Sequence, residues 1–132
     1  MQQLVYVSTS RSERPSLLEL ESILSASRRN NARDGLTGLL IVGGRRFLQV
    51  LEGPAEQLDL AYARIKRDPR HFALVELSCK PMTKRSFPDW DMGYEAGQGD
   101  LSELVHQLTS MIEDPSLQAQ LRGFADLHSK AA

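Results

Sequence analysis

Two apolar segments separated by a pair of glycines place the strongest constraint on the fold. Residues 36 to 42 form a nearly continuous apolar run, Gly43 and Gly44 follow it, and residues 45 to 52 return with further apolar side chains. Adjacent glycines between strand-like segments are typical of a tight hairpin turn, because glycine adopts positive φ angles without a steric penalty. The sequence therefore predicts an antiparallel hairpin, which ends at Gly53 and Pro54.

A strand and a helix are predicted on each side of this hairpin. Residues 3 to 9 resemble a first strand, and an amphipathic helix follows that we expect to end near Asn30. Residues 54 to 68 carry a second amphipathic pattern, and residues 72 to 80 a fourth strand. The βαββαβ order predicts an α+β, ferredoxin-like fold with two helices on one face of the sheet.

The C-terminal part is expected to add a fifth strand and a pair of helices. Residues 89 to 94 are predicted as the strand, and residues 100 to 130 carry two apolar stripes at helical spacing, interrupted near Asp114. We divide the chain into a core domain, residues 1–95, and a helical extension, residues 96–132. Because apolar stripes need burial, these helices either cover the free face of the sheet or pair with another subunit, which favours a homo-oligomer.

Composition and missing motifs narrow the function. The net charge of −1 gives no electrostatic reason to expect nucleic acid or an anionic membrane as a partner. The lone Cys79, the absence of a signal peptide and the lack of a long apolar run indicate a cytoplasmic protein. No Walker loop, dinucleotide fingerprint, nucleophile elbow or metal-ligand spacing is present, so we expect neither an enzyme nor a metal site.

Gln49 lies in the middle of an apolar strand. Because strand side chains alternate, Phe47, Gln49 and Leu51 share one face, while Leu48 and Val50 share the other. Neither face is polar, so the amide of Gln49 is expected to point into apolar surroundings. Burying an amide costs free energy unless it finds hydrogen-bond partners.

Further polar residues fall where the two helices should face the sheet. Taken singly, each has an ordinary structural explanation. Tyr6 fits a core tyrosine, Asn30 and Asn31 fit a helix C-terminal cap, and Arg64 with Asp68 fits an i,i+4 surface ion pair. Together with nearby isoleucines, they predict a cleft between the helices for a planar heteroaromatic ligand.

Four segments, in this order and spacing, carry a resemblance. They are "LVYVSTS", "SRRNNARDGLTGLLIVGGRRFLQVLEGP", "RIKRDPRH" and "RSFPDWDMGY". Their combination resembles the BLUF domain, a flavin-binding sensor of blue light, over residues 1 to 95. The resemblance implies a ferredoxin-like fold that holds FAD, or FMN or riboflavin in its place, between its two helices.

The resemblance also implies the roles of four photoswitch residues. Tyr6 matches the tyrosine that donates an electron and a proton when the flavin is excited, and Gln49 matches the glutamine whose hydrogen bonds then rearrange. Trp90 and Met92 match a pair on the late strand that relays the change to the C-terminal helices. The mechanism leaves rotation or tautomerisation of the Gln49 amide open.

The residues that hold the flavin follow from the same resemblance. Asn31, with Asn30 beside it, is expected at the pyrimidine end of the ring, and Arg64 and Asp68 near its C2=O and N3 edge. The remaining members are Ile23 and Ile65 as the walls of the ring site, Ser27 beside it and Arg29 near the phosphates.

The leading hypothesis is a short photoreceptor that acts by protein contact. Too few residues follow Tyr94 for a cyclase or phosphodiesterase. The signal is therefore expected to pass through the C-terminal helices to another copy of the chain or to a separate signalling protein. The alternatives are a small flavin-dependent redox enzyme, which needs a second cleft that no motif indicates, and a ferredoxin-like domain without a cofactor.

Overall fold

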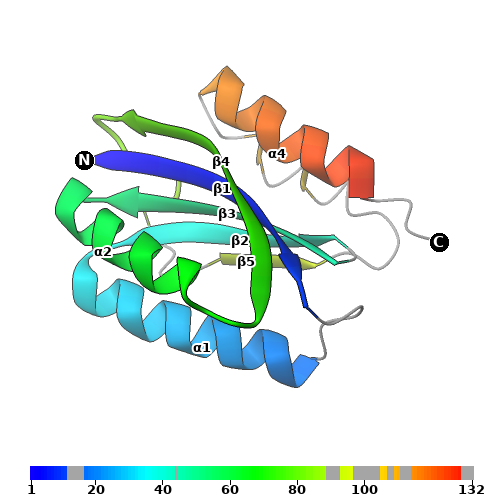
Figure 1. Ribbon diagram of the computed structural model, residues 1–132. Coiled ribbons are helices and arrows are strands. Elements are labelled where there is room, and N and C mark those ends of the chain that lie inside the picture. Colours follow the sequence, from blue (N-terminus) through cyan, green and yellow to red (C-terminus); the bar gives the residue numbers. More distant parts are fainter. Residues whose placement is uncertain are drawn as a thin grey trace.

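The computed structural model describes residues 1–11, 17–43, 45–88, 93–96, 105–106, 109–110 and 114–128. These residues form one five-stranded sheet with helices on both of its faces (Figure 1). In chain order the elements are β1 (Gln2–Ser10), α1 (Leu17–Asp34), β2 (Thr37–Gly43), β3 (Arg46–Gly53), α2 (Ala55–Lys66), β4 (His71–Pro81), β5 (Gly93–Ala96) and α4 (Pro115–His128).

The strand order is β4-β1-β3-β2-β5. β1 is antiparallel to both β3 and β4, and β2 is antiparallel to β3, which confirms the predicted ferredoxin-like arrangement. β5 adds to the edge of β2 in the parallel sense. It covers residues 93–96, whereas the predicted strand began at residue 89; residues 89–92 lie outside the described part of the chain.

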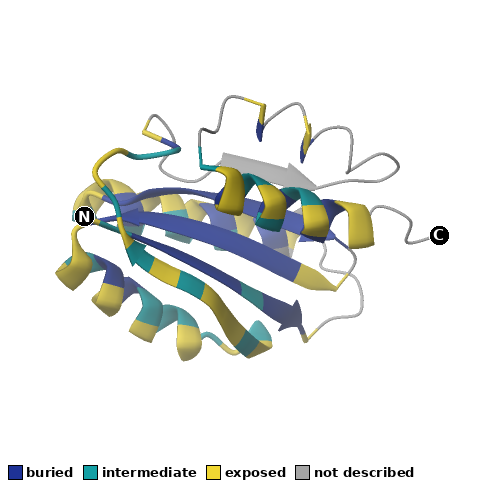
Figure 2. Cartoon of the chain, turned by 90° about the horizontal axis from the view of Figure 1, so that it is seen from above, coloured by how far each residue is buried: buried dark blue, intermediate teal, exposed yellow. Residues whose placement is uncertain are grey.

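Each face of the sheet carries its own apolar core. α1 and α2 pack on one face, where Tyr6, Leu24, Leu51 and Leu58 are buried together. On the opposite face, α4 buries a stripe of its own against β2 and β3 (Figure 2). That stripe consists of Leu117, Leu121, Phe124 and Ala125. Of the two alternatives predicted for the C-terminal helices, α4 therefore takes the first and covers the free face.

The first predicted C-terminal helix falls largely outside the described residues. Within residues 100–113, only residues 105, 106, 109 and 110 are described, and Val105 packs into the core beneath α4. Thr109 is buried as well, and its backbone oxygen accepts a hydrogen bond from the Gln118 side chain (3.0 Å).

α1 ends four residues later than predicted. It continues through Asn30 and Asn31 to Asp34, so these two asparagines do not cap the helix. The end is formed instead by Gly35, whose φ of 71° lies in the left-handed region. The N–H of Leu36 then donates to the carbonyl oxygen of Asn31 (2.9 Å), which closes a Schellman motif. The terminating signal was thus the glycine, which carries no penalty for positive φ.

The segment after β4 is bound to the start of the hairpin. The buried carboxylate of Glu52 accepts hydrogen bonds from the backbone N–H groups of Ser86 (2.8 Å) and Phe87 (2.7 Å), and from the side-chain amide of Gln3 (3.0 Å). Arg85 donates to the carbonyl oxygen of Gly35 (2.8 Å), at the end of α1. Residues 82–88 are therefore attached both to β3 and to the end of α1.

β4 forms one edge of the sheet and is irregular. Its pairing with β1 shifts register twice, and Ala73 has a φ of 54°. Three of its large apolar side chains are exposed, namely Phe72, Val75 and Leu77. Among the described residues, no helix is long and apolar enough to cross a membrane, and no group of three or more His, Cys, Asp or Glu side chains is arranged to hold a metal ion.

Candidate functional site

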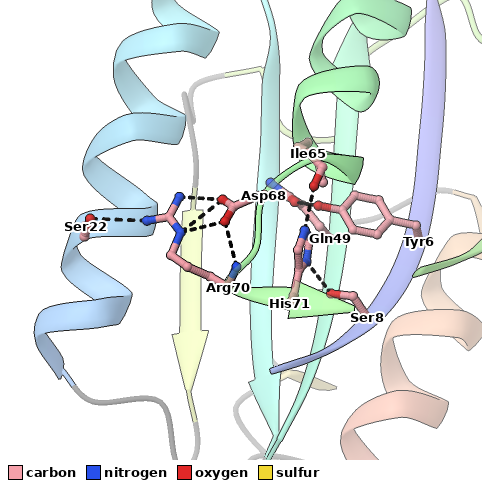
Figure 3. A network of polar contacts seen from close by, with 8 residues as sticks. All are labelled: Tyr6, Ser8, Ser22, Gln49, Ile65, Asp68, Arg70 and His71. Carbon is pink, nitrogen blue, oxygen red and sulfur yellow. Dashed lines mark hydrogen bonds and ion pairs between the residues drawn. The ribbon is translucent and has the colours of Figure 1, made fainter. Parts of the chain in front are cut away.

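The central contact of the site joins Tyr6 and Gln49. The antiparallel register of β1 and β3 places the two residues directly opposite each other. Alternation turns both side chains toward α1 and α2, where they are only 2% and 7% exposed. The Tyr6 hydroxyl donates a hydrogen bond to Oε1 of Gln49 (Figure 3). The buried amide of Gln49 therefore has the phenol of Tyr6 as a partner.

The environment keeps the Tyr6 phenol protonated. Burial raises the pKa of Tyr6 well above its ordinary value of 10.0, and the nearby Tyr62 and Asp68 raise it further. The hydroxyl hydrogen therefore stays on Tyr6 at neutral pH. It is available as the donor to Gln49 throughout the physiological range.

His71 connects α2 and β1 next to the Tyr6–Gln49 pair. A carbonyl oxygen can only accept, so Nε2 of His71 donates to the carbonyl oxygen of Ile65 (2.7 Å), near the end of α2. Nδ1 of the same ring lies 2.8 Å from Oγ of Ser8, on β1. The ring also meets Phe47 edge-on at 6.5 Å between centroids. His71 thus holds α2 against β1 beside Tyr6 (Figure 3).

Asp68 and Arg64 do not form the expected i,i+4 pair, because α2 ends at Lys66. Arg64 instead contacts Asp34, at the end of α1 (3.3 Å). Asp68 accepts from both the backbone N–H (2.9 Å) and the guanidinium (2.6 Å) of Arg70. Burial alone would raise the pKa of Asp68, but the hydrogen bonds from Arg70 outweigh it and lower this pKa. Asp68 therefore faces the site as a carboxylate.

Arg70 also links the connection between α2 and β4 to α1. Its guanidinium donates to Oγ of Ser22 on α1 (3.2 Å) while it holds Asp68 (Figure 3). Sequence reasoning did not assign Arg70 or His71 a role. Both follow Asp68 within the quoted segment "RIKRDPRH", and a polar pair at the start of a strand was the available signal.

A cleft between α1 and α2 contains most of the predicted flavin-binding residues. It consists of an inner hollow of about 50 Å³ and a middle hollow of about 210 Å³, which share Ser27, Gln49, Ile65, Asp68 and Arg70. The predicted residues that line the inner hollow are Tyr6, Ile23, Ser27, Gln49, Ile65 and Asp68. Those that line the middle hollow are Ser27, Asn30, Asn31, Gln49, Arg64, Ile65 and Asp68.

One predicted residue lies outside the cleft, and two others are not among the described residues. Arg29 is exposed on α1 and lines neither hollow. Trp90 and Met92 lie outside the described residues.

The chemistry of the cleft fits a flavin ring. A planar heteroaromatic ring needs apolar walls on its faces and hydrogen-bonding groups along its edge. Ile23 on α1 and Ile65 on α2 supply apolar walls to the inner hollow. Gln49 and Asn31, the latter only 4% exposed, supply buried amides, which can both donate and accept. The residues present are therefore suited to hold the isoalloxazine ring.

Comparison with known families identifies the domain. A family model described as BLUF, sensors of blue-light using FAD, matches residues 1–93. The chain belongs to the BLUF family. The resemblance inferred from the four sequence segments is therefore confirmed, and members of this family bind flavin.

BLUF proteins of several architectures are similar to this chain. The blue light- and temperature-regulated antirepressor BluF of Escherichia coli (strain K12) is 39% identical over 84 residues, which cover 64% of this chain and 21% of that protein. The photoactivated adenylate cyclase subunit beta of Euglena longa is 35% identical over 119 residues, 82% of this chain and 14% of that protein. The chain thus spans about a fifth or less of these two relatives.

Solved structures show the same fold. The dark-state structure of the BLUF protein BlrB is 32% identical, with a TM-score of 0.73 over 93% of this chain and 96% of that chain. The structure of a bacterial light-regulated adenylyl cyclase is 30% identical, with a TM-score of 0.71 over 97% of this chain and 34% of that chain. The fold therefore occurs in a chain of similar length and in a longer cyclase.

Proposed function

We propose that this chain is a blue-light photoreceptor in which Tyr6 and Gln49 form a hydrogen-bond switch beside a bound flavin. The observation that carries the proposal is the buried hydrogen bond from the Tyr6 hydroxyl to Oε1 of Gln49, on the wall of the cleft. When bound, the flavin supplies absorption of blue light and an excited state that accepts an electron.

Tyr6 is the electron donor of the proposed switch. Its raised pKa means that it begins as a neutral phenol. Losing an electron makes a phenol strongly acidic, so the hydroxyl proton leaves along the hydrogen bond that already exists. The acceptor at the other end of that bond is the amide oxygen of Gln49.

Gln49 converts this proton movement into a lasting change. Its amide carries a donor at one end and an acceptor at the other. Rotation or tautomerisation exchanges the group that Gln49 presents to the edge of the ring. A new donor toward a ring carbonyl stabilises the charge that the excited state gathers there, so absorption moves to longer wavelength.

The remaining cleft residues hold the ring in place for this switch. Asn31, with Asn30 beside it, holds the pyrimidine end, while Arg64 and Asp68 lie toward the C2=O and N3 edge. Support comes from the middle hollow, which these four residues line together with Ser27. Ile23 and Ile65 pack on the two faces of the ring. FAD is the flavin that the family description names, and FMN or riboflavin can present the same ring.

We infer that the signal leaves through β3 as well as through Trp90 and Met92, which precede β5 in the sequence. Gln49 faces the cleft, whereas its neighbours Leu48 and Val50 face the core beneath α4. A displacement of Gln49 therefore reaches α4 through packed side chains. The names of the antirepressor and cyclase relatives support an output through protein contact, so we propose a second copy of the chain or a separate signalling protein as the partner.

An absorption experiment tests the proposal. The purified protein is recorded in the dark, under blue light and again in the dark. We expect flavin bands that move slightly to the red and return. Gln49→Leu should retain the flavin and lose the shift, whereas Gln57→Leu, on α2 outside the cleft, should keep it. A normal shift in Gln49→Leu, or reduction by NAD(P)H with turnover, contradicts the proposal; turnover would favour a redox enzyme.

A further inference from the structure

The cleft continues outward into a third hollow. This outer hollow is shallow and wide open to solvent, has a volume of about 470 Å³, and is lined by Arg64, Arg67, Asp68, Pro69 and Arg70, at the connection between α2 and β4. It shares Arg64, Asp68 and Arg70 with the middle hollow. Unlike the inner hollow, it touches neither Tyr6 nor Gln49. A ligand whose ring fills the inner hollows therefore has a path to this surface.

The lining of the outer hollow carries an excess of positive charge. It contains three arginines and a single carboxylate. The negative charge of Asp68 is compensated by Arg70, whose guanidinium lies 2.6 Å from the carboxylate. Arg64 shares Asp34 with Arg33, and its own contact is longer, 3.3 Å. Arg67 is exposed, and none of the described residues forms an ion pair with it. One guanidinium is thus available to an anion.

We propose that the outer hollow binds the phosphate attached to the flavin side chain, with Arg67 as its contact. This inference rests on the proposed function, because it requires the ring to lie between α1 and α2. A guanidinium suits this task, since its planar fork matches phosphate oxygens in pairs. Arg29, which the family resemblance placed near the phosphates, lines none of the three hollows.

The same surface provides no site for an adenine ring. Among its five lining residues none is aromatic, and Pro69 is the only apolar one. Adenine recognition requires a stacking partner or an apolar slot with hydrogen bonds at its edge. The site therefore distinguishes flavins that carry a phosphate from riboflavin, and it does not distinguish FMN from FAD.

Flavin titrations of the full chain, freed of its bound flavin, test this specificity. Dissociation constants for riboflavin, FMN and FAD are measured by fluorescence at about 0.1 M and about 1 M salt, where the Debye length falls from about 10 Å to about 3 Å. At low salt we expect FMN and FAD to bind equally, and about threefold more tightly than riboflavin, as suits one exposed charge pair. High salt should remove most of this difference.

Three arginine variants assign the contact. Arg67→Gln should weaken FMN and FAD binding about threefold, to the level of riboflavin. Arg46→Gln removes the same charge from the opposite face of the sheet, where Leu48 and Val50 also point, and should keep the FMN advantage. Arg29→Gln should keep it as well.

Each contrary outcome has a distinct meaning. Equal binding of riboflavin and FMN at low salt overturns the phosphate site but leaves the photoswitch standing. Loss of the FMN advantage in Arg29→Gln, with Arg67→Gln normal, also overturns it, because the contact then lies on α1. FAD binding much more tightly than FMN would show an adenine site and contradict the assigned specificity. If riboflavin itself does not bind, the proposed function fails together with this inference.

Discussion

At the scale of single residues, the position of Gln49 depends on strand register. Tyr6 and Gln49 are directly opposed across β1 and β3, so both side chains enter the same core. A slip of one residue would turn one of them to the α4 side, into the apolar core beneath that helix. The cost of burying an amide is offset here by the Tyr6 hydroxyl, and the proposed switch uses the same hydrogen bond.

Removing one hydroxyl tests this pair. Tyr6→Phe keeps the ring and its packing but deletes the donor to Gln49, so we expect flavin binding to persist and the red shift to disappear. The free energy of unfolding should fall by about 1 kcal/mol, as for one buried hydrogen bond. The measurements are light-minus-dark absorption and denaturant unfolding.

Tyr62→Phe is the matched control for this substitution. The Tyr62 ring lies 5.4 Å from that of Tyr6 but does not line the cleft. The Tyr62→Phe variant should show the normal red shift of the flavin absorption under blue light. A normal shift in Tyr6→Phe would remove Tyr6 from the mechanism.

At the scale of elements, one carboxylate organises the segment that follows β4. Glu52 is fully buried at the end of β3 and accepts from the backbone of Ser86 and Phe87. Arg85 reaches back to the carbonyl oxygen of Gly35, where α1 ends. Residues 85–87 are therefore attached to two elements of the cleft, although Phe87 packs into the core on the other side of the sheet.

Removal of the Glu52 carboxylate should lower the stability of the fold. Glu52→Ala leaves two backbone N–H groups and the Gln3 amide without their acceptor, so we expect the free energy of unfolding to fall by about 2–4 kcal/mol. Glu56→Ala, on the exposed first turn of α2, should stay within about 0.5 kcal/mol of the parent. Denaturant unfolding of both variants checks this, and equal stabilities would contradict the assigned role.

At the scale of the whole molecule, the sheet is the shared middle layer of two cores. The strands carry apolar residues on both faces, and helices close both sides. α4 is therefore part of the folded unit and contributes to its stability. The predicted boundary between a core domain and a helical extension remains a prediction, and the packing of α4 onto β2 and β3 argues that the two parts fold together.

Two leucines of the same helix test this view. Leu121, on the side of α4 that packs on the sheet, is 0% exposed, whereas Leu127 of the same helix is 76% exposed. Leu121→Ala should lower the free energy of unfolding by about 2–5 kcal/mol, and Leu127→Ala by no more than about 0.5 kcal/mol. A small effect of Leu121→Ala in denaturant unfolding would mean that α4 does not stabilise the sheet.

Periodicity predicted the strands and helices between residues 1 and 81. Alternation indicated that Tyr6 and Gln49 can both face the helices, because strand geometry has a period of two residues. Their direct opposition depends on the register of the two strands, which alternation alone does not give. Periodicity does not predict contacts between segments that are distant in the sequence. Arg64 with Asp34 and Arg70 with Ser22 join positions that no local pattern relates.

Helix ends were the least predictable feature. Asn30 and Asn31 looked like a cap, but the chain continues as helix until Gly35 permits a left-handed turn. The polar stretch before that glycine carries no apolar periodicity from which its length could be judged. The end of α2 before Asp68 was misjudged in the same way, and with it the expected Arg64–Asp68 pair.

The irregularity of β4 has a consequence for solubility. An edge strand with exposed apolar side chains, here Phe72, Val75 and Leu77, is a template on which other chains can add strands and aggregate. The two register shifts and the positive φ of Ala73 interrupt its row of outward hydrogen-bonding groups. A regular strand cannot pair along the whole of such an edge. The bulges of β4 thus protect this sheet against edge-to-edge growth.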